Sequence, residues 1–246
     1  MIDVEAYLKK QIAVYLANEA LEKRLENRER RPGRGKEGAL LYGPYLIISR
    51  EKGAGGNAIA RLVGERLGWQ VFNNEIVDEI AKRAHVRRRL IESLDERNRE
   101  TIQDTIGELL NPKQIGTSGY LVYLKQVVLT LGHQGDVVIV GRGARFILPD
   151  QFGLSVRMVA PVETRVQRIA ERERLSLKAA RVEVKKNDRE RVKAVSRHFG
   201  HDVTDPLSHD LIINTAAVKI EAAAEVILTA LQQKLGVQVK ASGQRK

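Results

Sequence analysis

The chain has 246 residues, which suits one large domain or one domain with an extension. Hydrophobic residues make up 43% and charged residues 30%, so the chain can bury a core and is not a disordered polymer. The absence of cysteine excludes a disulfide scaffold, a cysteine nucleophile and a thiolate zinc site, and it fits a cytoplasmic location. Apolar runs are short and the N-terminus is acidic, so we expect neither a membrane span nor a signal peptide.

The net charge of +11 indicates a polyanionic partner. Basic residues exceed acidic ones by seven between residues 165 and 197, and by five between residues 23 and 36. Each stretch is also compatible with an ordinary solvated helix face. Few aromatic residues accompany these stretches, which disfavours nucleic acid as the partner because single strands are bound by base stacking.

The first forty residues differ in pattern from the rest. Apolar residues recur at helical spacing up to about residue 30, and a proline with three glycines and several charges follows in residues 31–38. We therefore predict an N-terminal helix and linker at 1–40, a main domain at 41–236 and a disordered tail at 237–246. A helix with an unburied apolar stripe usually docks on its own domain or on a second chain. We predict a homodimer through this helix, and docking on its own chain is the alternative.

After Pro44 the chain alternates between short apolar runs and helical patterns, which indicates βαβ units and a parallel sheet. Strands are expected at 45–49, 69–72, 137–140, 156–159 and 211–213. Helices are expected at 57–67, 73–110, 118–131 (ended by Gly132), 162–174, 177–199 and 218–235.

The sharpest local feature is a glycine-rich turn between the first expected strand and the next helix, Ser49-Arg50-Glu51-Lys52-Gly53-Ala54-Gly55-Gly56-Asn57-Ala58. In α/β folds such a turn lies where ligands bind, at the carboxyl end of a strand. Glycines let backbone N–H groups approach a phosphate, and the helix N-terminus adds a favourable dipole. A glycine-rich turn without a ligand is the alternative.

Two phosphate-binding motifs compete for this turn. Gly53, Gly55 and Ala58 satisfy the dinucleotide pattern G-x-G-x-x-G/A, with Glu75 about 20 residues on for the ribose. Ser49, Arg50, Glu51 and Lys52 precede the first glycine, however, which gives the longer loop of a P-loop. The P-loop pattern GxxxxGK[ST] fits imperfectly, because Arg50 stands at its first glycine and Gly56 at its lysine.

Four motifs in sequence order resemble the cytidylate kinase-like family of P-loop proteins. The resemblance covers roughly residues 45–235. The motifs are Ser49-Arg50-Glu51 with Gly53-Ala54-Gly55-Gly56, then Val138-Ile139-Val140-Gly141-Arg142-Gly143-Ala144, then Lys185-Lys186-Asn187-Asp188-Arg189-Glu190-Arg191, and last Asp210-Leu211-Ile212-Ile213-Asn214-Thr215.

The resemblance implies an α/β fold of the P-loop kinase type, with a three-layer parallel sheet, helices on both faces and an arginine-rich helical lid. It implies transfer of the γ-phosphoryl group of ATP, with Mg²⁺, to a nucleoside monophosphate such as CMP or dCMP. Phosphoryl transfer needs positive charge around the moving group, which the basic stretch at 165–197 supplies.

The family motifs also imply site residues, and the motifs assign no protein ligand to a metal. Glu75 and Asp78 follow the second strand, where an acceptor segment starts in such kinases; an acid-rich helix N-terminus is the alternative. We expect ATP phosphates at Arg50, Lys52, Gly53, Ala54, Gly55, Gly56 and Asn57, catalysis by Arg142, Arg189 and Arg191, and acceptor binding by Glu75, Asp78, Arg142 and Asp188.

The chain departs from the family pattern at four positions that normally support lysine and magnesium chemistry. Gly56 replaces the P-loop lysine, and Ala58 replaces the threonine two positions further on. Val140 replaces the acid that ends the third strand, and Gly143 the acid after the turn arginine. Arg50 or Lys52 is a candidate to replace the lysine. A nucleotide-binding regulatory module without turnover is therefore the alternative function.

Overall fold

The computed structural model describes residues 42–82 and 119–239, which fall into two compact units. The described part of the first unit is 42–43, 74–82 and 119–135, and that of the second is 44–73 and 136–239. The predicted N-terminal helix and linker, the homodimer through them and most of the tail lie outside the described residues. The predicted division into domains therefore stays a prediction. Within the described ranges, no helix is both long and apolar enough to cross a bilayer.

The second unit is built on a five-stranded parallel sheet with the strand order β2-β3-β1-β4-β5. Its central strand β1 pairs with β3 on one side and with β4 on the other. The predicted parallel α/β class is therefore confirmed. The strands are β1 (Tyr45–Arg50), β2 (Gln70–Phe72), β3 (Val137–Val140), β4 (Gly153–Val159) and β5 (Leu211–Asn214).

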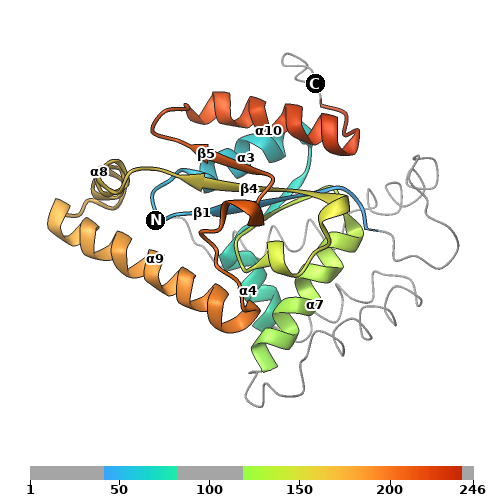
Figure 1. Cartoon of the computed structure of the whole chain (residues 1–246), viewed down its shortest axis with the longest axis horizontal. Helices are drawn as coiled ribbons and strands as arrows, with labels where there is room; N and C mark the ends of the chain where they lie inside the picture. Colours follow the sequence, from blue (N-terminus) through green and yellow to red (C-terminus); the bar gives the residue numbers. More distant parts are fainter. Residues whose placement is uncertain (1–41, 83–118, 240–246) are drawn as a thin grey trace, which may run out of the picture. The chain divides into compact units, whose positions relative to one another are not determined.

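Two helices, α3 (Gly56–Leu67) and α10 (Ile220–Leu235), pack on one face of this sheet and bury its main core. Two more, α8 (Val162–Glu173) and α9 (Leu177–Phe199), pack on each other through a small apolar cluster. Figure 1 shows α9 on the opposite side of the strands from α10. The bounds predicted for the basic helix, 177–199, are confirmed at both ends.

The fourth strand begins earlier than predicted. The sequence predicted 156–159, but β4 starts at Gly153, which pairs with Tyr45. Glycine and serine have low strand propensity, so this end of the strand gives no periodic signal. A side chain at residue 153 would collide with the Tyr45 ring, so the packing itself requires glycine.

The first unit contains α4 (Asn74–Lys82) and α7 (Gly119–Gln134), which pack together. The helix predicted at 118–131 was expected to end at Gly132, but this was wrong, because α7 continues to Gln134. The left-handed residue that follows the helix is Gly135, with φ of 63°. Of two nearby glycines, the sequence does not say which one leaves the helical conformation.

Candidate functional site

The glycine loop connects β1 to α3 and consists of residues 51–55. Gly53 and Gly55 have φ of 85° and 79°, values that favour glycine strongly over residues with a side chain. Gly55 caps the N-terminus of α3 and provides no side-chain acceptor for its first amides. The helix therefore opens on unsatisfied backbone donors, which is the arrangement that the loop composition predicted.

Three carbonyl groups of the loop are held by side chains behind it. Arg165 donates Nη1 to the carbonyl of Lys52 at 3.2 Å, and Arg168 reaches the carbonyl of Gly53 at 3.5 Å. The hydroxyl of Thr215 donates to the carbonyl of Ala54 at 3.0 Å. Arg168 also donates to Thr215, to its Oγ1 at 3.0 Å and its carbonyl at 2.8 Å, so these two residues form one support.

This support directs N–H groups to the other side of the loop. A trans peptide places its C=O and N–H on opposite sides, and no described peptide bond is cis. The N–H groups of Gly53, Gly55, Gly56 and Asn57 donate to no acceptor among the described residues. Free amides at a helix N-terminus form a cradle for a phosphate or similar anion.

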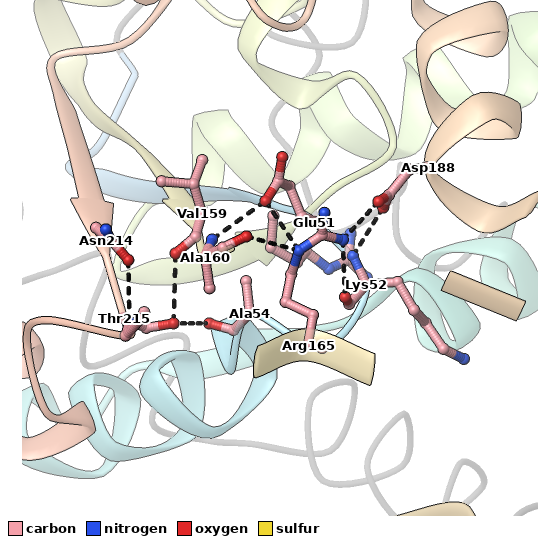
Figure 2. A network of polar contacts seen from close by, with 12 residues as sticks. Glu51, Lys52, Ala54, Val159, Ala160, Arg165, Asp188, Asn214 and Thr215 are labelled. Atoms are coloured by element: carbon pink, nitrogen blue, oxygen red, sulfur yellow. Dashed lines mark hydrogen bonds and ion pairs between the residues drawn. The ribbon is translucent and has the colours of Figure 1, made fainter. Parts of the chain in front are cut away.

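A buried arginine joins the loop to helix α9, as Figure 2 shows. Arg165 is 6% exposed and lies on α8. Its Nε donates to the carbonyl of Ala160 at 2.8 Å and lies 3.2 Å from Glu51 Oε2. Its Nη1 is paired with Asp188 of α9, whose other oxygen accepts the N–H of Lys52 at 3.0 Å. One guanidinium thus contacts Ala160, which follows β4, as well as the glycine loop and α9.

The two basic side chains of the loop lie in different places. The Lys52 ammonium is paired with Glu173 at 3.1 Å and with Glu183 at 3.4 Å, so contact with a phosphate requires it to exchange those partners. Arg50 packs its stem against Gly56, and its guanidinium lies against Gly141. The role of either residue in place of the missing lysine stays a prediction.

The arrangement of Arg50 explains why lysine is absent from position 56. A Cβ on Gly56 would lie 2.8 Å from the Cβ of Arg50, so a side chain cannot start there unless Arg50 moves. Gly143 has a comparable reason, because it has φ of 66° and a Cβ there would run into the ring of Phe199 at the end of α9. In this arrangement of Arg50 and Phe199, neither position has room for a side chain.

The turn after β3 runs through three successive residues with positive φ, Gly141, Arg142 and Gly143. Arg142 at 58° is the unusual member, because residues with a side chain seldom adopt this conformation. Arg142 also lies close enough to Arg191 of α9 to lower its pKa by charge repulsion, although burial is the larger cause. Two of the three residues predicted to be catalytic, Arg142 and Arg191, thus lie near each other.

The remaining predicted residues lie on α9 and α4. Arg191 is partly buried and donates to the carbonyl of Arg50 at 2.8 Å, whereas Arg189 is exposed on α9. Glu75 and Asp78 lie on α4, in the other unit. There the Asp78 carboxylate accepts a hydrogen bond from Tyr120 at 2.5 Å.

Four residues of the site were missed from the sequence: Arg157, Arg165, Arg168 and Thr215. Arg165 and Arg168 on α8 contributed to the basic stretch at 165–197, but the sequence assigned neither of them a role in the site. The signal for Arg157 was a charged residue inside an otherwise apolar strand, since β4 ends Val156-Arg157-Met158-Val159.

The described residues do not fit a magnesium site built from protein side chains. Val140 and Ala58 offer no oxygen ligand, and no group of three metal-binding side chains occurs in the described part of the chain. Glu51 and Asp188 already accept bonds from Arg165 and from backbone amides. We therefore assign no step to a protein-bound magnesium ion.

The class of protein follows from three features: a parallel sheet, a glycine loop with free amides, and the basic helix α9, which contacts that loop. Together they are typical of an α/β protein that binds nucleotide phosphates. The chain belongs to the cytidylate kinase-like family, whose sequence profile matches residues 46–217. It is 24% identical over 193 residues to the cytidylate kinase of Sulfolobus acidocaldarius, and this alignment covers 77% of this chain and 94% of that protein. It is 26% identical over 191 residues to the cytidylate kinase of Desulfurococcus amylolyticus, with the same two shares.

The fold also resembles a solved structure. An uncharacterized protein from Eubacterium ventriosum aligns with a TM-score of 0.60 and 23% identity, covering 77% of this chain and 98% of that one. At this identity the likeness concerns the fold alone. The family expectation drawn from the four sequence motifs is therefore confirmed by the sequence profile.

Proposed function

We propose that this protein transfers the γ-phosphoryl group of ATP to a nucleoside monophosphate, with a CMP- or dCMP-like acceptor. The observation that carries the proposal is the glycine loop, whose amides at Gly53, Gly55, Gly56 and Asn57 have no acceptor among the described residues. The preference for a cytosine acceptor rests on the names of the two relatives described above.

The residues of the site have distinct tasks in this proposal. The loop amides bind the phosphates of ATP, and Arg142 and Arg191 face the charge that develops as the phosphoryl group moves. Because Arg191 already hydrogen-bonds the carbonyl of Arg50, it lies beside the loop before any nucleotide is bound. Preorganised cations contribute most in such a partly buried site, since they need no rearrangement during the reaction.

Mg²⁺ enters this proposal only as an ion carried in by ATP, where it neutralises phosphate charge. The same lack of protein ligands favours a second candidate, a nucleotide-binding regulatory module that does not turn over. The two candidates share the phosphate cradle and differ in whether ADP is released. The cytoplasmic location stays a prediction.

A coupled ADP-release assay across ribo- and deoxyribonucleoside monophosphates separates the candidates. We expect release to rise above the rate with ATP alone when CMP or dCMP is added. Arg191→Gln should lower kcat/KM by about 100-fold, the size typical of one lost transition-state donor. Arg181→Gln removes the same charge from an exposed position of the same helix that was assigned no role in the site, and it should change kcat/KM far less. Tight ATP binding without release for any acceptor would favour the regulatory module.

A further inference from the structure

Arg157 is a buried cation with little compensation from the protein. Its side chain is 8% exposed, and its Nη1 donates to the hydroxyl of Ser49 at 3.3 Å. The nearest carboxylate oxygen, Oε1 of Glu51, is 4.0 Å from its Nη2. A guanidinium carries five N–H donors, so most of those on Arg157 have no acceptor within hydrogen-bonding distance among the described residues.

The carboxylate of Glu51 does not neutralise this charge by itself. Its Oε2 accepts the N–H of Ala160 at 3.1 Å and lies 3.2 Å from the Nε of Arg165. One carboxylate is therefore divided between two guanidinium groups, and the closer contact goes to Arg165. Burial is the main reason that the pKa of Arg157 is lowered, and the attraction of Glu51 offsets that effect only in part.

Other arginines increase the local surplus of positive charge. Arg142, Arg157 and Arg165 all lie near enough to Arg191 to lower its pKa by repulsion. The partly buried carboxylates in their midst are those of Glu51 and Asp188, and the exposed Asp202 adds a further attraction to Arg157. Even without Arg142, three guanidinium groups, those of Arg157, Arg165 and Arg191, thus face two partly buried carboxylates. Such a surplus is costly unless an anion enters.

Arg157 also lies close to the glycine loop. In the sheet it is the register partner of Ser49, which precedes the loop by one residue of β1. Its side chain projects from the sheet on the face away from α3 and α10, because its neighbours Val156 and Met158 belong to the core that these helices cover. Arg191 of α9 donates a hydrogen bond to the carbonyl of Arg50, the last residue of β1 before the loop.

We propose that Arg157 is a phosphate-binding residue, which together with Arg191 binds phosphate oxygens of the nucleotide held by the glycine loop. The inference rests on the proposed function, because the loop must hold a nucleotide. It gives the site a cation from β4 where the P-loop lysine is missing. Arginine suits this task because its planar group binds phosphate oxygens in pairs.

The test compares Arg157→Gln with the wild type, using inorganic tripolyphosphate as the probe in calorimetric titration and thermal unfolding. We expect the affinity for tripolyphosphate to fall by about 10- to 100-fold, as for a lost charged hydrogen bond. Without a ligand, the variant should melt no lower than the wild type, because an undercompensated buried charge has been removed. Arg181→Gln, which removes an exposed arginine paired with Glu163, is the matched control and should leave the affinity nearly unchanged.

Unchanged affinity in Arg157→Gln overturns the proposal and leaves the proposed function intact, provided that the wild type binds. A wild type that binds neither tripolyphosphate nor ATP contradicts the proposed function instead. If Arg157→Gln is weaker in binding and also less stable, Arg157→Lys decides between the two roles. Partial recovery of affinity by the lysine variant supports phosphate binding, and no recovery shows that Arg157 serves only the fold.

Discussion

Replacing Arg165 by methionine is expected to lower the free energy of unfolding by about 3 kcal/mol, the lower end of the range for breaking a buried ion pair. The lower end applies because Glu51 and Asp188, the two carboxylates left behind, are about one quarter exposed. The carbonyls of Lys52 and Ala160 lose a donor as well. Urea denaturation monitored by circular dichroism measures the change.

A second consequence of the same substitution concerns binding. Without Arg165, α9 loses the ion pair between Asp188 and Arg165, which connects α9 to the loop. We therefore expect the ATP affinity to fall as well. Arg181→Met removes an exposed arginine from α9 and should leave both quantities unchanged within error. Equal stability of the Arg165 and Arg181 variants would show that the network around Arg165 contributes nothing to the fold.

Replacing Gly53 by alanine is expected to lower the affinity for ATP by about 10- to 100-fold, because it combines two costs. The positive φ of 85° costs a residue with a side chain about 1–2 kcal/mol. In addition, the new Cβ would lie 2.8 Å from the carbonyl oxygen of Arg165, a backbone atom that cannot rotate away. The loop must then shift, and its amides no longer converge on one anion.

The matched control is Gly236→Ala, which has φ of 64° with no atom within 4 Å of the new Cβ. It carries the conformational cost without the collision and lies after α10, outside the loop. Isothermal titration with ATP on both variants separates the two costs. Wild-type affinity in Gly53→Ala would mean that the loop does not hold the phosphates.

A side chain at Gly55 would meet less steric hindrance than one at Gly53. A Cβ on Gly55 would point toward Ile220 at an ordinary contact distance of 3.6 Å. The steric effect is therefore mild at this position, and the φ of 79° is the main obstacle to a side chain. The sequence predicts that both positions need glycine. It does not predict that an added Cβ would collide with its surroundings only at Gly53.

Local patterns in the sequence are sufficient for most of the second unit. The strand at 137–140 and the helix at 177–199 are confirmed at both ends, since apolar runs and turn residues define their limits. The glycine loop and the family follow from residues that are close together in the chain. These features depend on neighbours a few positions away, which is the information that a single sequence contains.

The supports of the site are different, because they join distant parts of the chain. Arg165 contacts Glu51 and Asp188, and Thr215 contacts Ala54 across 161 positions. In the sequence Arg165 is one cation among twelve in a basic stretch, and its burial depends on how α8 packs. Its position four residues before the buried Ile169 places it on the inner face of α8, but the helical spacing does not indicate which distant carboxylates it meets there.

The phosphate cradle is tested most directly by the amide nitrogen–proton spectrum of the loop, recorded on the isotope-labelled protein with ATP and, separately, with adenosine. We expect ATP to shift the signals of Gly53, Gly55, Gly56 and Asn57 strongly, because their free N–H groups then donate to phosphate oxygens. Adenosine, which has no phosphate, should leave them in place. Loop signals that stay unchanged while ATP shifts signals elsewhere would contradict the phosphate cradle.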